Sequence, residues 1–219
     1  MNSIVITKTY QEPPFCEKEI LRYAGCKAAD SKILSLMHSC ISEARDKLIY
    51  KVCYRELSVS IKDSFCDFGC FNLTSKSLAQ NLKGCKRAVI FSATVGVEID
   101  RLIAKYGRIS PSKALMFQAI GAERIEALCD AFCCDIEKEK QTSLGPRFSP
   151  GYGDLPLSVQ KDIFNVLECS KQIGLFLNDS LLMSPSKSVT AFLGLGAGAE
   201  KTNKCDICNK SDCTFRGAL

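Results

Sequence analysis

A stretch from Ser112 to about Lys140 constrains the fold of this chain more than any other, because its apolar residues recur at near-helical spacing throughout. These apolar residues are Leu115, Ala119, Ile120, Ile125, Leu128, Phe132 and Ile136. The sequence therefore predicts one long helix that closes in a charged run at Lys140. Shorter helices are predicted from Cys16 or Glu17 to Gly25 and over 30–48, 75–84 and 158–173.

Strands are predicted where apolar and polar residues alternate or where a short apolar run is bounded by turn residues. They cover 3–7, 49–54, 57–61, 87–93, 181–183 and 188–193. Because helices and strands are mixed without a regular βαβ rhythm, we expect an α+β fold, with a central antiparallel twisted sheet and flanking helices in a single domain. Within it, we expect an N-terminal strand and helical segment over 1–45 packed on the core, the core over 46–195, and a linker with a Cys-rich tail over 196–219.

The charge balance argues against a nucleic-acid partner. Lys and Arg number 29 and Asp and Glu 24, so the net charge is 29 − 24 = +5, and the basic residues are scattered among acidic ones. No signal peptide is visible at the N-terminus and no run of 18 apolar residues occurs, so we expect a cytoplasmic protein without a membrane span. Its 14 cysteines should then be reduced thiols, and we expect 11 of them to be packing residues.

The other three cysteines form a C-x2-C pair, Cys205 and Cys208, followed by Cys213. This spacing allows three thiolates to approach one metal ion, and thiolates suit zinc or an iron–sulfur cluster. A redox or incidental role for the three thiols is the alternative. The fourth ligand would come from Cys169, another distant cysteine, a partner or a small molecule.

The loop from Arg147 to Pro156 has residues typical of a ligand site. Arg147 offers a planar fork for a carboxylate or phosphate. Gly151 and Gly153 let the backbone approach a ligand closely, and Tyr152 offers a ring and a hydroxyl. By chemistry alone, the segment is equally a ligand loop or a tight turn with a packed tyrosine.

The string from Arg147 to Pro156, R-F-S-P-G-Y-G-D-L-P, resembles the R-x-x-P-G-Y-x-x-x-P loop in the AdoMet-binding reactivation domain of cobalamin-dependent methionine synthase. The segment Met183-Ser-Pro-Ser-Lys-Ser-Val-Thr190 resembles its M-x-P-x-x-S-V-S/T segment. Residues 20–25, 94–100 and 167–183 are also similar to segments of this family. The resemblance covers about residues 17–195, and the Cys-rich tail is similar to one in some stand-alone members.

This resemblance implies a reactivation subunit that binds AdoMet for the reductive methylation of cob(II)alamin held on a partner protein. The partner would be a cobalamin-binding methionine synthase or a related corrinoid protein, and a flavodoxin or ferredoxin would donate the electron. The chain would be a component of a methyltransferase system rather than a complete enzyme. Methyl transfer from a sulfonium needs no general acid or base, so no catalytic side chain is expected, and His38 is assigned a structural role near an apolar helix face.

The resemblance also assigns the ligand contacts. Arg147 would hold the methionine part of AdoMet through its carboxylate, and Glu126 on the long helix would lie near the ligand's ammonium or sulfonium charge. Glu126 could instead be a solvated residue on the helix surface. The loop residues Pro150, Gly151 and Tyr152 would border the ligand.

The adenosine contacts depart from the family pattern. Where the fused enzyme has an aromatic pair, this chain has Phe192 and Leu193, and Phe192 would cover the same surface from a neighbouring position. Two other functions remain open at this point. One is an iron–sulfur or zinc redox protein whose tail is the functional element, and the other is an AdoMet-binding activator of a different corrinoid methyltransferase.

Overall fold

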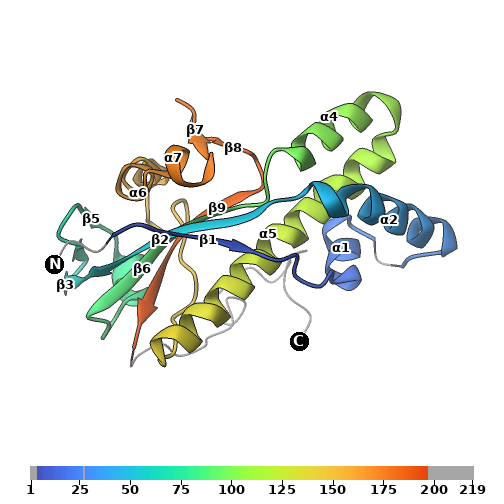
Figure 1. The fold of residues 1–219 in the computed structure, drawn as a ribbon. Coiled ribbons are helices and arrows are strands. Elements are labelled where there is room, and N and C mark those ends of the chain that lie inside the picture. The colour runs from blue at the N-terminus through green and yellow to red at the C-terminus, as the bar shows by residue number, and fades with distance from the viewer. Residues whose placement is uncertain (1–3, 27, 197–219) are drawn as a thin grey trace.

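The computed structural model describes residues 4–26 and 28–196 and is organised around one antiparallel sheet. Four strands pair in the order β1-β2-β6-β9 (Figure 1). Their bounds are Ile6–Tyr10 for β1, Tyr50–Ser58 for β2, Arg87–Thr94 for β6 and Ser188–Leu195 for β9. Each neighbouring pair is antiparallel, and β6 pairs over its whole length with both β2 and β9.

Helices cover both faces of this sheet because side chains of a strand point alternately to opposite faces. One face packs against α1 (Glu17–Tyr23), α2 (Ser31–Ala44), α4 (Glu98–Ile109) and α5 (Pro111–Lys140). The other face packs against α3 (Lys76–Asn81), α6 (Gln160–Leu167) and α7 (Cys169–Ile173). In Figure 1, α5 runs along one side of the sheet, while α6 and α7 lie on the other.

Short elements complete the described fold. A three-stranded sheet contains β3 (Ser60–Lys62), β4 (Phe65–Asp67) and β5 (Asn72–Thr74). A two-stranded sheet pairs β7 (Phe176–Leu177) with β8 (Met183–Ser184). Single 3-10 turns occupy Arg45–Lys47 and Leu157–Val159.

The predicted α+β fold with an antiparallel sheet and flanking helices is confirmed. The predicted long helix is α5, which begins at Pro111 and ends at Lys140. Asp30 caps α2, since its carboxylate accepts a hydrogen bond of 2.8 Å from the Ile33 amide. Ser75 does the same for α3, at 3.1 Å from the Leu78 amide.

Some predictions of single elements, and the placement of His38, were wrong. The strand predicted over 57–61 is divided between β2 and β3, and only Met183 of the strand predicted over 181–183 belongs to a strand. The helix predicted over 158–173 is broken at Glu168, whose φ of 50° belongs to the left-handed region and separates α6 from α7. The strand predicted over 3–7 is β1, shifted to 6–10, because this edge strand is mostly exposed and has little apolar alternation. His38 does not pack on an apolar face: it is exposed and lies 3.1 Å from a Glu17 carboxylate oxygen.

The expectation that 11 cysteines are packing residues holds for six of them. Those six are buried and comprise Cys40, Cys53, Cys66, Cys85, Cys129 and Cys169. Cys26 and Cys133 are half-buried, and Cys16, Cys70 and Cys134 are exposed. Cys169 lies in the core with its sulfur 3.2 Å from the Ser92 hydroxyl, so in this conformation it is not accessible as a metal ligand.

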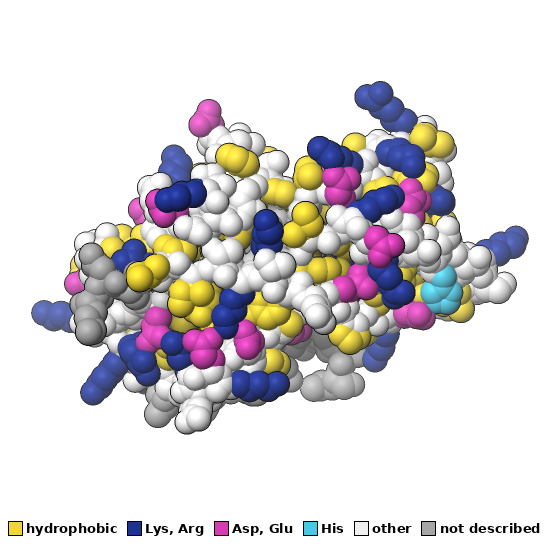
Figure 2. Space-filling model, viewed as in Figure 1, with side chains coloured by type: hydrophobic (Ala, Val, Ile, Leu, Met, Phe, Trp, Pro, Cys, Tyr) yellow, Lys and Arg dark blue, Asp and Glu magenta, His cyan; other side chains and the backbone are white. Residues whose placement is uncertain are grey.

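The surface mixes both signs of charge. On the face shown in Figure 2, Lys and Arg side chains lie among Asp and Glu side chains, with apolar atoms between them. Pairs such as Lys8 with Asp135 and Glu139, at 2.8 and 2.7 Å, account for part of this pattern. Among the described residues, no helix has the length and apolar content needed to cross a bilayer.

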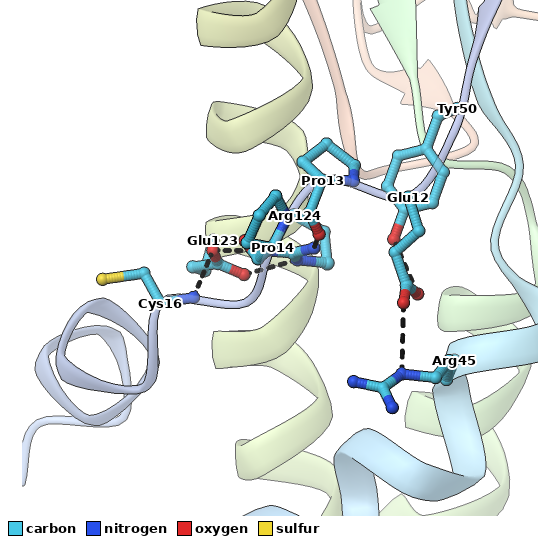
Figure 3. Close-up of polar contacts among 8 residues, drawn as sticks. All are labelled: Glu12, Pro13, Pro14, Cys16, Arg45, Tyr50, Glu123 and Arg124. Carbon is cyan, nitrogen blue, oxygen red and sulfur yellow. Dashed lines mark hydrogen bonds and ion pairs between the residues drawn. The ribbon is translucent and has the colours of Figure 1, made fainter.

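A buried ionic network fastens the N-terminal segment to α5 (Figure 3). The Arg124 side chain is completely buried, pairs with the neighbouring Glu123 and donates to the carbonyl oxygens of Pro13 and Pro14. Glu123 also accepts a 3.1 Å hydrogen bond from the Cys16 amide, at the start of α1. The network therefore positions α1 on α5, where the two helices pack closely.

Candidate functional site

One line of residues on α5 forms the base of the candidate site. Glu126, Cys129, Asp130 and Cys133 follow one another at i, i+3, i+4 and i+7, so they share one face of the helix. We call this set the α5 face. Glu126 and Asp130 form ion pairs with Arg147, and Cys133 lies close enough for the charge of Arg147 to affect its pKa. Arg147 belongs to the loop that follows the helix.

Arg147 is held by two carboxylates of the α5 face. Its Nη2 lies 2.6 Å from Glu126 Oε2, and its Nη1 lies 2.6 Å from Asp130 Oδ1. The Arg147 side chain is 15% exposed. Burial acts to lower the pKa of Arg147, but the neighbouring acidic groups, Cys129, Glu126 and Asp130, act in the opposite direction and raise it, so the guanidinium stays charged.

The two thiols of the α5 face are protonated groups. Burial raises the pKa of Cys133 to about 11, although the nearby Arg147 acts in the opposite direction. Burial also raises the pKa of Cys129 well above its usual range. Both thiols are therefore neutral, and of the two only Cys133 is partly exposed. Among residues 4–26 and 28–196, no three His, Cys, Asp or Glu side chains gather as a metal site would require.

The backbone of the loop is fixed at both ends. At the start of the loop, Phe148 exchanges two hydrogen bonds with Phe192 of β9, at 3.0 and 2.9 Å, so the residue next to Arg147 is joined to the central sheet. Inside the loop, Gly151 has a φ of 90° and its amide donates to the Leu155 carbonyl at 2.9 Å. The sharp turn at 151 thus depends on a residue without a side chain.

Asp154 anchors the far side of the loop to the start of α3. Its carboxylate accepts hydrogen bonds from the Ser75 hydroxyl at 2.6 Å and from the amides of Lys76 and Ser77 at 2.8 and 3.0 Å. These three donors hold the pKa of Asp154 well below its usual range. The adjacent Gly153 lies against Ser77, where any larger residue would clash.

Two tyrosines lie near the Glu126 carboxylate. Tyr152 is 50% exposed at the tip of the loop, and its ring meets Phe148 edge-on with centroids 6.1 Å apart. Burial raises the pKa of Tyr152, and the negative charge of Glu126 adds to this effect. Burial and Glu126 also raise the pKa of Tyr23, which belongs to α1. Tyr23 was not among the predicted site residues.

The structure brings together part of the predicted site. Arg147, Glu126 and the loop residues Pro150, Gly151 and Tyr152 lie in one region, with Pro150 buried and Gly151 and Tyr152 exposed. Asp130, Cys129 and Cys133 were missed, although their helical spacing from Glu126 was a usable signal.

Phe192 and Leu193 do not expose a side chain to this region. Both are 0% exposed in β9, Phe192 on the face that packs against Phe68 and Leu193 on the opposite face. A ligand could reach neither side chain in this conformation, so we leave both out of the candidate site. The predicted metal ligands Cys205, Cys208 and Cys213 lie outside the described residues.

Two other segments that resemble the family, 94–100 and 183–190, contact each other rather than the loop at 147–156. Asp100 at the start of α4 accepts hydrogen bonds from the Ser186 amide, at 2.7 Å, and from the Ser186 hydroxyl. Ser188 donates to the Thr94 hydroxyl at 2.9 Å. These contacts hold the loop before β9 against α4, so they give the two segments a structural role.

Comparison with known structures identifies the fold. A crystal structure of the MetH reactivation domain bound to AdoHcy superposes with a TM-score of 0.69, covering 91% of this chain and 80% of that one. The chain has the fold of the MetH reactivation domain. The two sequences are 12% identical, so the likeness concerns the fold alone. No family model and no curated protein sequence matches the chain.

The arrangement suits a small zwitterion. A guanidinium can donate two hydrogen bonds to a ligand carboxylate, and a protein carboxylate beside it can accept hydrogen bonds from a ligand ammonium group. A half-exposed tyrosine, Tyr152, lies close enough to feel both charges. Such a set has the chemistry to bind and orient an amino-acid group.

Proposed function

We propose that the chain binds AdoMet at Arg147 and serves as a reactivation subunit of cobalamin-dependent methionine synthase. The observation that carries this proposal is the Arg147–Glu126 pair beside a Pro150-Gly151-Tyr152 loop, in a chain with the fold of a domain solved with AdoHcy. AdoHcy shares the amino-acid group of AdoMet, and the paired charges suit that group. Binding of AdoMet by this chain is the first step to test.

Each residue has a distinct role in this proposal. Arg147 would bind the carboxylate of AdoMet, and Glu126 would accept its ammonium group once the guanidinium is shared with the ligand. Tyr152 and the backbone of Pro150 and Gly151 would border the ligand, and the hydrogen bonds of Asp154 would keep the loop in place. The sulfonium of AdoMet supplies the methyl group, so the protein's contribution is binding and orientation.

The corrinoid partner and the electron donor belong to the same proposal. Reductive methylation of cob(II)alamin would need a cobalamin-binding methionine synthase or related corrinoid protein and a reductant such as a flavodoxin or ferredoxin. An activator of another corrinoid methyltransferase uses the same site, and only the partner would differ. A zinc or iron–sulfur role for Cys205, Cys208 and Cys213 stays a prediction from the sequence.

Calorimetry with AdoMet tests the site directly. We expect the wild-type chain to bind AdoMet and Arg147→Ala to lose about ten- to a hundredfold in affinity, which corresponds to roughly 1.5–3 kcal/mol for one charged contact. Arg101→Ala is the matched control, since Arg101 is an exposed arginine paired with Glu98 on α4. Absence of binding by the wild type, or equal binding by Arg147→Ala, would remove the proposed function.

A further inference from the structure

Each terminal nitrogen of Arg147 already has a carboxylate of the protein as a partner. Both terminal nitrogens lie 2.6 Å from a carboxylate oxygen, Nη2 from Glu126 and Nη1 from Asp130. A ligand carboxylate that approaches Nη1 meets the carboxylate of Asp130 in the same place. The guanidinium has further N–H donors, but two carboxylates in one position repel each other, so a ligand that takes this position displaces Asp130 or is itself excluded.

The two protein carboxylates are not equally easy to displace. The Asp130 side chain is 70% exposed and the Glu126 side chain 43%. An exposed carboxylate gains hydration from water when it leaves its partner, so its ion pair contributes little net free energy. Arg147 itself is fixed by burial and by the attachment of Phe148 to β9. Asp130 is therefore the carboxylate that is displaced more easily from Arg147.

We propose that Asp130 occupies the position of the ligand's carboxylate and is displaced when the ligand binds. Asp130 then acts as an internal competitor that lowers the affinity for ligands with a free carboxylate next to their amino group. It has no such effect on a nucleoside thioether without that group. This inference rests on the proposed function, because it specifies how the same site discriminates between ligands.

The position of Asp130 on α5 fits this role. It lies one helical turn after Glu126, so both carboxylates reach the guanidinium from one rigid helix. Glu126 can keep Nη2 while Nη1 is exchanged from Asp130 to the ligand. After the exchange, the guanidinium still has two anionic partners, and Asp130 points into water.

Asp130→Asn tests the inference because it removes the charge and keeps the shape of the side chain. We expect this variant to bind AdoHcy and AdoMet about two- to fivefold more tightly than the wild type, which is the range for loss of one exposed competing ion pair. Its affinity for 5′-methylthioadenosine, which lacks the amino-acid group, should not change. Asp130→Ser, which shortens the side chain, should behave in the same way.

The control is Asp46→Asn, which removes an exposed carboxylate from the turn after α2 and should leave all three affinities unchanged. Weaker or unchanged AdoHcy binding by Asp130→Asn would overturn the inference, because Asp130 would then position Arg147 or have no role. Equal gains for AdoHcy and 5′-methylthioadenosine would overturn it as well. Failure of the wild type to bind AdoMet would instead remove the proposed function.

Discussion

Asp154 and Gly153 define the ligand loop through contacts with the start of α3. Asp154 accepts three hydrogen bonds there, and Gly153 leaves room for Ser77. Neither contact could be predicted from the sequence, because Ser77 and Gly153 are 76 positions apart and no pattern links them. Arg147 was predictable, since its loop carries a specific string of residues. Asp130 was missed because a charged residue on a helix usually belongs to a solvated surface.

Asp154→Asn should lower stability in a pH-dependent way. The folded-state pKa of Asp154 is depressed, so its contribution is present above the unfolded-state value of about 4 and is lost as the pH falls below it. The urea midpoint of the variant should therefore be lower than that of the wild type at pH 7, and the difference should narrow at pH 3. Asp162→Asn, at an exposed position of α6, serves as control. An equal difference at both pH values would contradict this assignment.

Elements with a long buried face were predictable, and those shaped by a single backbone angle were not. α5 has buried residues from Met116 to Ile136, so the spacing of its apolar residues predicted one long helix. The break between α6 and α7 depends on Glu168, a residue type that gives no turn signal in the sequence, whereas Gly174 at the end of α7 gives one. β1 was misplaced because an exposed edge strand lacks a buried face that would specify its register.

Glu168→Gly should stabilise the protein by about 0.5–1 kcal/mol, because glycine adopts the left-handed conformation at no steric cost. Gly174→Ala is the reciprocal change. Gly174 has a φ of 69° and open space around it, so alanine there should destabilise by a similar amount through conformation alone. Urea unfolding followed by circular dichroism measures both. Destabilisation by Glu168→Gly would show that its side chain matters more than its backbone angle.

At the scale of the whole molecule, the N-terminal segment is part of the domain rather than an appendage. β1 is a strand of the central sheet, and the segment before α1 is tied to α5 by Arg124 and Glu123. The fold class was predictable because the mixture of elements allowed few architectures. The buried ion pair was not, since adjacent opposite charges in a helix usually face solvent.

Arg124→Met should destabilise the protein by about 3–5 kcal/mol, because Glu123 would stay buried without its cation and two proline carbonyls would lose their donor. The double variant Glu123→Gln with Arg124→Met should recover part of this loss. Arg101→Met, at an exposed ion pair, should change stability by less than about 1 kcal/mol. Urea unfolding compares all three, and a small effect of Arg124→Met alone would refute a structural role for the pair.

Within a few residues, α5 makes two separate sets of contacts. The number of residues between these two sets is therefore fixed. Glu123 and Arg124 meet the N-terminal segment, while Glu126 and Asp130 meet Arg147. Each residue of an α-helix turns the chain by about 100°. Insertion or deletion of one residue between 124 and 126 would rotate one set of contacts away from its partners while the other stayed in place. A related sequence that keeps both sets of contacts should therefore have neither an insertion nor a deletion between them.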